Sequence, residues 1–335
     1  NKSIVFSVRI AGKTEPWSTN FDLYQVAATG QTKPKNLTAA NKAWDTQPVF
    51  SADGKTLFYR AMKRAGYESD RFALMSMDLT TSKTKEIAPN WDRSADGLML
   101  SDNGSAIYTV ADNLGQHALF SVDIASGAVK SIVSAGTVSE FDVVGEQILF
   151  TLVNLASPAQ LFLMPSNGGN ARLISANNQA VIANTAWGEY EQFNFKGWND
   201  ETVYGYVVKP ANYQAGKKYP IAFIIHGGPH SSFGNGWSYR WNPQTYAGQG
   251  FAVVMVDFHG SSGYGQDFAD SLVQHWGSRP LEDLQKGYAA ALQKYSFLDA
   301  NRACALGASY GGYMVNWIAG NWPEPWKCLI NHDGV

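Results

Sequence analysis

A short strand pattern recurs four times in the first half of the chain, and this recurrence constrains the fold more than any other feature of the sequence. Each copy is a five-residue run with leucine in second position, and successive leucines lie 51, 45 and 42 residues apart. The copies span residues 22–26, 73–77, 118–122 and 160–164. A period of about 40 to 50 residues made of short strands is typical of the blades of a β-propeller.

Dipeptides that favour tight turns separate the expected strands. Asp53-Gly54 and Asn103-Gly104 each precede an apolar, strand-like segment. Such dipeptides favour two-residue hairpins, in which both central residues take positive φ. Each copy of the pattern therefore predicts a run of short antiparallel strands joined by these hairpins.

Residues 1–183 are accordingly predicted to be the C-terminal blades of a partial β-propeller, about four in number. A β-sandwich is the alternative, and the fourfold recurrence of one pattern counts against it. Four blades rarely close a ring alone, so we expect earlier blades to precede Asn1. The chain opens within an expected strand, and its start therefore indicates nothing about targeting.

The second half of the chain alternates strand and helix patterns. Residues 221–225 and 251–257 are near-continuous apolar runs, as expected of strands that are buried on both faces. Residues 281–295 predict a helix with an apolar face, and residues 303–306 predict the next buried strand. This alternation predicts a mostly parallel sheet, and we assign residues 184–335 to the N-terminal part of an α/β-hydrolase domain.

The sequence Gly307-Ala308-Ser309-Tyr310-Gly311 follows the last buried strand and precedes a helical segment. This strand–turn–helix context is the one that a nucleophile elbow requires, so Ser309 is the candidate catalytic nucleophile. The elbow glycines, Gly307 and Gly311, allow the strand and the helix to approach closely. The main-chain N–H of Tyr310 is a candidate donor to an oxyanion.

A second glycine-rich segment, His226-Gly227-Gly228-Pro229, follows the strand at 221–225. In α/β-hydrolases this loop supplies the other N–H of the oxyanion hole, a role that we assign to Gly228. Each such donor stabilises the transition state by about 3 kcal/mol. An ordinary Gly-Pro turn is the alternative, which the elbow further along the chain disfavours.

Residues 198–335 resemble the prolyl oligopeptidase family of serine peptidases, also called S9. The motifs that carry the resemblance are 226–230, 259–265, 276–283 and 307–314. Within the family, this part of the chain is most similar to the acylaminoacyl-peptidase and dipeptidyl-peptidase V branch. Residues 257–260 and 331–335 favour dipeptidyl-peptidase V or a related bacterial dipeptidyl aminopeptidase. The resemblance implies a propeller ahead of an α/β-hydrolase domain, and a catalytic triad in the order Ser, Asp, His.

Only 26 residues follow Ser309, so we expect the triad Asp and His to lie outside this chain and the chain alone to be inactive. The adjacent pair His332-Asp333 is not favoured as their substitute. We expect His226 and His230 to shape the oxyanion loop and His259 to have a structural role. His117 and His275 are interpreted as ordinary surface or packing residues.

The resemblance predicts a serine peptidase that releases dipeptides from the free N-terminus of short peptides through an acyl-enzyme on Ser309. One alternative is an acylaminoacyl peptidase or a broad oligopeptidase, which would prefer blocked or longer peptides. An esterase and a non-catalytic propeller scaffold are less favoured. Export to the periplasm or the medium is expected from the relatives, with the cytoplasm as the alternative, and a homodimer is left open.

Composition excludes several other classes of function. The net charge is −2 and no long Lys/Arg cluster occurs, which argues against nucleic acid as a partner. The longest apolar stretches are too short to span a bilayer, so no membrane partner is expected. No cluster has metal-ligand spacing, and we predict neither a metal nor a cofactor. The two cysteines, Cys304 and Cys328, are interpreted as buried thiols, with a disulfide as the alternative.

Overall fold

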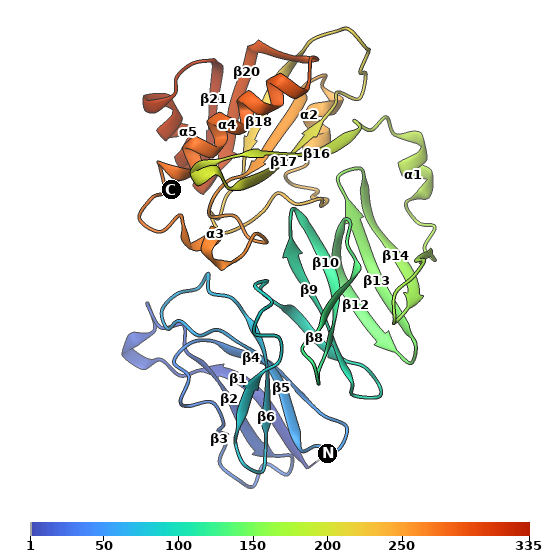
Figure 1. The fold of residues 1–335 in the computed structure, drawn as a ribbon, viewed down its shortest axis with the longest axis vertical. Helices are drawn as coiled ribbons and strands as arrows, with labels where there is room; N and C mark the ends of the chain where they lie inside the picture. Colours follow the sequence, from blue (N-terminus) through green and yellow to red (C-terminus); the bar gives the residue numbers. More distant parts are fainter. Residues whose placement is uncertain (1) are drawn as a thin grey trace.

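The computed structural model describes residues 2–335, which form three antiparallel or largely antiparallel sheets followed by an α/β region (Figure 1). We call the first three, which comprise β1 to β15, the N-terminal sheets. The α/β region contains one six-stranded sheet, β16 to β21, and most of the helices. In Figure 1 the two parts lie against each other, with the N-terminal sheets in blue to green and the α/β region in yellow to red.

The N-terminal sheets are built from successive antiparallel meanders. The first two meanders form separate sheets, and the next two join into one eight-stranded sheet through a single parallel pair, His117 and Thr137. The elements of the first two are β1 (Ser3–Arg9), η1 (Gly12–Thr14), β2 (Phe21–Ala27), β3 (Lys35–Asn36), β4 (Asp45–Phe50), β5 (Thr56–Ala61), β6 (Ala73–Asp78) and β7 (Thr84–Glu86). Those of the joined sheet are β8 (Asp96–Leu100), β9 (Ala106–Asn113), β10 (Gln116–Asp123), β11 (Val129–Val133), β12 (Thr137–Val144), β13 (Gln147–Asn154), β14 (Ser157–Pro165) and β15 (Arg172–Leu173).

The recurring sequence pattern falls on equivalent strands of these meanders, namely β2, β6, β10 and β14. In each case the next strand of the meander pairs with it in antiparallel orientation. Leu23, Leu74 and Leu119 are buried, because they face the layer between neighbouring meanders. The prediction that each copy is a run of short antiparallel strands is confirmed.

The prediction of two-residue hairpins at the Asp-Gly and Asn-Gly dipeptides is wrong. Gly54 and Gly104 do take positive φ, at 70° and 68°, but the preceding Asp53 and Asn103 do not. The loop is longer, since β4 ends at Phe50 and β5 begins at Thr56. The Asp53 carboxylate accepts a hydrogen bond from the N–H of Lys55 (3.0 Å), so the side chain closes the turn in place of a second positive φ.

The α/β sheet is mixed, with strand order β16-β17-β19-β18-β20-β21. The pairs β19-β18, β18-β20 and β20-β21 are parallel, which confirms the predicted mostly parallel sheet. Its strands are β16 (Tyr190–Lys196), β17 (Thr202–Val208), β18 (Tyr219–Ile225), β19 (Ala252–Asp257), β20 (Leu298–Ala308) and β21 (Trp326–His332). The helices are α1 (Gln179–Asn184), η2 (Trp198–Asp200), α2 (Pro243–Gly248), α3 (Gln266–Asp270), α4 (Arg279–Lys294) and α5 (Tyr310–Asn321). Helix α1 leads from β15 to β16, and the predicted boundary after residue 183 falls at its C-terminal end.

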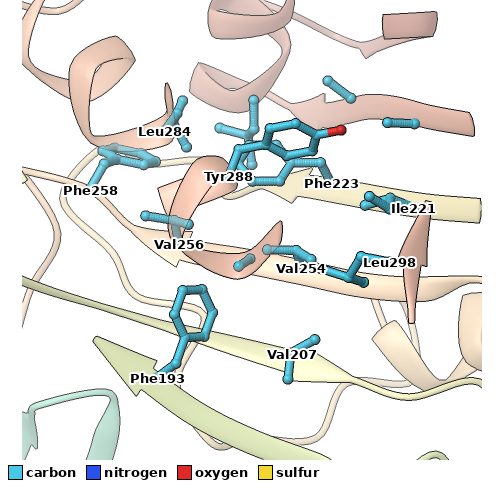
Figure 2. Close-up of a cluster of buried hydrophobic side chains, with 14 of the residues drawn as sticks. Phe193, Val207, Ile221, Phe223, Val254, Val256, Phe258, Leu284, Tyr288 and Leu298 are labelled. Atoms are coloured by element: carbon cyan, nitrogen blue, oxygen red, sulfur yellow. The ribbon is translucent and has the colours of Figure 1, made fainter. Parts of the chain in front are cut away.

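The apolar runs of the sequence are explained by burial on both faces of this sheet. On one face, Phe223 meets Tyr288 of α4 with ring centroids 5.7 Å apart, and Figure 2 shows Leu284 and Phe258 in the same cluster. Helix α5 packs on this face as well. On the opposite face, Ala222 and its neighbours pack against α2. Helix α4 matches the predicted helix at 281–295 to within two residues.

The two cysteines form a disulfide, so their interpretation as buried thiols is wrong. Cys304 on β20 and Cys328 on β21 are register partners, with Cα atoms 4.7 Å apart. The pairing depends on which residues of two strands lie opposite each other, and spacing along the sequence does not specify that. Among residues 2–335, no helix has the length and hydropathy needed to cross a membrane.

Candidate active site

Ser309 lies between the last residue of β20 and the first residue of α5, in a backbone conformation that non-glycine residues rarely adopt. Its φ is 55° and its ψ is −122°. Such a conformation costs on the order of 1–3 kcal/mol and persists only where the surroundings enforce it. The turn leaves the Ser309 side chain exposed at the carboxyl end of the parallel strands, where substrates reach the active sites of open α/β sheets.

The elbow is held by close packing that only glycine permits. A Cβ atom at Gly307 would lie 2.5 Å from the carbonyl of Gly311, and one at Gly311 would lie 2.2 Å from the carbonyl oxygen of Ile225. Contacts below 3.0 Å are essentially never seen for real Cβ atoms. The two elbow glycines therefore allow β20, α5 and β18 to meet at one point, as the sequence predicts.

Main-chain hydrogen bonds fix Ser309 to the neighbouring strand and helix. Its N–H donates to the carbonyl of His332 at the end of β21 (3.1 Å), and its own carbonyl accepts from Tyr313 in α5 (3.0 Å). The edge strand β21 is therefore part of the support of the elbow.

The loop after β18 passes directly against the nucleophile. A Cβ atom at Gly227 would lie 3.3 Å from the Cβ of Ser309 and 3.9 Å from its Oγ. The next residue, Gly228, has a φ of 116°, which a residue with a side chain rarely adopts. We call residues 226–236 the oxyanion loop. The structure thus brings together the two segments that the sequence singled out.

Tyr310 is the first residue of α5, so its N–H has no acceptor within the helix. Its side chain is fully buried, and its hydroxyl donates to the carbonyl of Trp276 (2.6 Å). Burial raises the pKa of this hydroxyl, so it stays protonated as a donor. Because the Tyr310 ring is anchored in this way, its main-chain N–H, which lies beside Ser309, is the group that Tyr310 can donate to a substrate.

A cavity of about 410 Å³ opens beside Ser309. Most of the side chains that line it are apolar, among them Phe233, Trp241, Tyr246 and Met255. A concave, apolar site with a few converging polar groups is the usual form of a small-molecule or side-chain subsite. This cavity is therefore a candidate subsite beside Ser309.

The histidines near the elbow have structural partners. His226 stacks on Phe258 (4.2 Å between ring centroids), and its Nε2 lies 2.8 Å from Ser261 Oγ. Desolvation lowers the pKa of His226, and burial likewise lowers that of His230, so both are neutral at pH 7. His259 is buried against the Asp283 carboxylate (2.6 Å). These contacts agree with the predicted role of His226 and His230 in shaping the oxyanion loop and with the predicted structural role of His259.

His332 and Asp333 do not form a catalytic pair with Ser309. Their side chains are exposed and lie 3.6 Å apart, and the ring of His332 contacts Trp241. Across residues 2–335, no histidine side chain makes a hydrogen bond with Ser309 Oγ. The expectation that the triad Asp and His lie outside this chain stays a prediction.

Comparisons with known proteins point to one family. The family model described as "Prolyl oligopeptidase family" matches residues 237–335, which include the elbow. Dipeptidyl-peptidase 5 of Schizosaccharomyces pombe is 33% identical over 90% of this chain and 44% of its own length. The chain belongs to the prolyl oligopeptidase family. A probable dipeptidyl-peptidase 5 of Aspergillus clavatus is 35% identical over 86% of this chain and 41% of its own length. The chain thus spans less than half the length of these relatives.

A solved structure shows that the family's fold extends over the whole chain. The structure of an acylaminoacyl peptidase in complex with Z-Gly-Gly-Phe-chloromethyl ketone superposes with a TM-score of 0.85 at 24% identity. The match covers 100% of this chain and 51% of that one. The predicted combination of propeller-type sheets and an α/β-hydrolase domain is confirmed at this level, while the number of blades is not.

Sequence reasoning missed one residue of this prolyl oligopeptidase site, Asp257. It is buried at the end of β19, where it accepts hydrogen bonds from Phe233 N (3.0 Å), Tyr264 OH (2.7 Å) and the hydroxyl of Ser232. The signal was present, because an acidic residue that ends an apolar strand at the carboxyl edge of a parallel sheet lies next to the loops that follow the strands. Its partners, however, follow only from the folded loops.

Proposed function

We propose that the protein carrying this chain is a serine peptidase that removes dipeptides from the free N-terminus of short peptides. The observation that carries the proposal is Ser309 on a strained elbow, with the Gly227-Gly228 segment packed against it. The relatives named dipeptidyl-peptidase 5 support the dipeptidyl specificity, since they are 33% and 35% identical over most of this chain.

The reaction is acyl transfer. Ser309 Oγ attacks the carbonyl of the second residue of the peptide, and a histidine base supplied by the rest of the protein takes the hydroxyl proton. The negative charge that forms on the carbonyl oxygen is stabilised by the N–H groups of Gly228 and Tyr310. The leaving amine takes the proton from the histidine, and water then releases the dipeptide from Ser309.

The apolar cavity beside Ser309 supports a preference for an apolar residue at the position before the cleaved bond. Its volume of about 410 Å³ accommodates a large side chain together with part of the backbone. We further propose that the meanders of the N-terminal sheets are about four blades of a propeller ring that covers the site and admits only short peptides.

The disulfide between Cys304 and Cys328 supports export. Disulfides form and persist in oxidising compartments and are rare in the cytosol. We therefore propose that the protein functions in the periplasm or outside the cell.

The test is labelling of the full-length protein with a fluorophosphonate probe, followed by intact mass measurement. We expect one adduct, which Ser309→Ala abolishes. Dipeptide reporters with a free amine should then be cleaved, while N-acetylated versions of the same reporters should not. Preferred cleavage of the acetylated reporters would favour an acylaminoacyl peptidase, and absence of any adduct would contradict the catalytic role of Ser309.

A further inference from the structure

The segment 259–265, a motif on which the family resemblance rests, has no part in the chemistry described above. Its residues, however, contact the oxyanion loop on one side and the N-terminal sheets on the other. We call residues 260–265 the brace loop.

The brace loop holds the oxyanion loop at three points. Ser261 Oγ lies 2.8 Å from Nε2 of His226, and the Gly260 carbonyl lies 3.0 Å from Nδ1 of His230. The N–H of Ser262 donates to the carbonyl of Ser231 (2.9 Å). The donor residue Gly228 lies between these attachment points, so its position depends on where the brace loop lies.

The brace loop is in turn held by the hairpin of β9 and β10, whose tip meets the α/β region in Figure 1. Ser262 Oγ donates to the carboxylate of Asp112 (2.6 Å), and the N–H of Leu114 donates to the carbonyl of Gly263 (3.0 Å). A Cβ atom at Gly263 would lie 2.9 Å from the Cβ of Asp112, so the two backbones are in close contact.

The hydrogen bond from Ser262 to Asp112 has a charged acceptor. Burial raises the pKa of Asp112, but hydrogen bonds from His117 and Ser262 outweigh this effect and leave the pKa below its usual value. Asp112 is therefore a charged acceptor, and hydrogen bonds to charged acceptors are shorter and stronger than neutral ones.

We propose that Ser262 and Asp112 are positioning residues, through which the β9–β10 hairpin of the N-terminal sheets fixes the oxyanion loop for catalysis. The proposal rests on the proposed peptidase function. It makes the catalytic rate depend on contact between the two parts of the molecule.

The experiment compares Ser262→Ala, Asp112→Asn and the double variant in the full-length protein, with a dipeptide reporter that has a free amine. Displacing a catalytic group by about 1 Å can cost on the order of 100-fold in rate, so we expect partial release to lower kcat about tenfold. KM should change by less than about threefold, because the oxyanion donors act mainly in the transition state. The double variant should match Ser262→Ala, since Asp112→Asn weakens only the hydrogen bond that Ser262→Ala already removes.

Two further variants distinguish positioning of the oxyanion loop from a general loss of contact between the N-terminal sheets and the α/β region. Gln192→Ala removes a hydrogen bond of 2.7 Å from the α/β region to the carbonyl of Leu114, on the same hairpin, and leaves the hydrogen bonds of this hairpin with Ser262 and Gly263 in place. It should leave kcat within about twofold. Ser262→Thr keeps the hydroxyl and should restore most of the rate. Thermal unfolding of each variant checks that it is folded.

The proposal is overturned if Ser262→Ala lowers kcat no more than Gln192→Ala does, or if the effects of Ser262→Ala and Asp112→Asn multiply. The variant Ser309→Ala distinguishes a failure of the positioning role of Ser262 and Asp112 from a failure of the proposed peptidase function. If Ser309→Ala is inactive while Ser262→Ala is fully active, only the positioning role is wrong, whereas an active Ser309→Ala would contradict the peptidase mechanism itself.

Discussion

Removal of the disulfide is expected to destabilise the α/β region by an amount that the structure allows us to calculate. Cys304 and Cys328 are separated by 24 residues, and in the chain-entropy relation a loop of this length corresponds to about 3.5 kcal/mol at 25 °C. The double variant Cys304→Ala/Cys328→Ala removes the cross-link without leaving a free thiol. With a urea dependence of about 2 kcal/mol per M, the unfolding midpoint of this region should fall by about 1.8 M.

The assay is urea unfolding followed by tryptophan fluorescence, with and without a reductant. Reduced wild-type protein should unfold at nearly the same urea concentration as the double variant, and the reductant should leave the variant unchanged. If reduction does not move the wild-type midpoint, the cross-link is not formed in the protein. If the midpoint moves but the variant is as stable as the oxidised protein, the reasoning from loop entropy is wrong.

Three other predictions concern the elbow, the histidines and a buried carboxylate. Gly311→Ala places a Cβ 2.2 Å from the carbonyl oxygen of Ile225 and should cost about 3 kcal/mol or more, together with loss of probe labelling; urea unfolding and the probe assay measure the two effects. The pKa of His226 is lowered by desolvation, so the unfolded chain binds more protons and stability should fall as the pH drops below about 6.5. His226→Gln should flatten that part of the pH profile, and an unchanged profile would contradict this assignment. Asp283→Ala removes the acceptor of the main-chain N–H and the ring Nδ1 of His259 (each 2.6 Å) and of the main-chain N–H of Trp198 (2.7 Å), so three donors are left unpaired. At 1–3 kcal/mol for each donor, we expect a loss of about 3–9 kcal/mol, and a loss below about 1 kcal/mol would show that water replaces the carboxylate.

The α/β region and its elbow could be predicted from the sequence because their signals are local. The apolar run at 221–225 indicates a strand buried on both faces, and the glycines two positions before and after Ser309 mark the elbow within five residues of sequence, although Gly311 is required by its contact with Ile225. The turns of the N-terminal sheets were harder to predict, since the Asp53 carboxylate closes its loop through a hydrogen bond that competes with a two-residue hairpin.

Contacts between distant segments could not be predicted in the same way. Cys304 and Cys328 meet only because β20 and β21 pair in one particular register. Ser262 and Asp112 are 150 positions apart, and each is of an ordinary surface type, so nothing in the sequence marks them as partners. The motif at 259–265 supports the family resemblance, but no physical reason for its composition is evident from the sequence. That reason is its contacts with the oxyanion loop and with the β9–β10 hairpin, which exist only in the folded chain.

The strain at Ser309 explains why so much of the surrounding structure serves to hold one residue. A positive φ at a serine costs on the order of 1–3 kcal/mol, which is comparable to a few hydrogen bonds. The N–H of Ser309 is bound to His332 on β21, and the disulfide ties the same strand to β20 near its start. On the other side, the oxyanion loop is held by the brace loop and thereby by the N-terminal sheets. The nucleophile and its oxyanion donors are therefore fixed from two directions by elements that have no part in the chemistry.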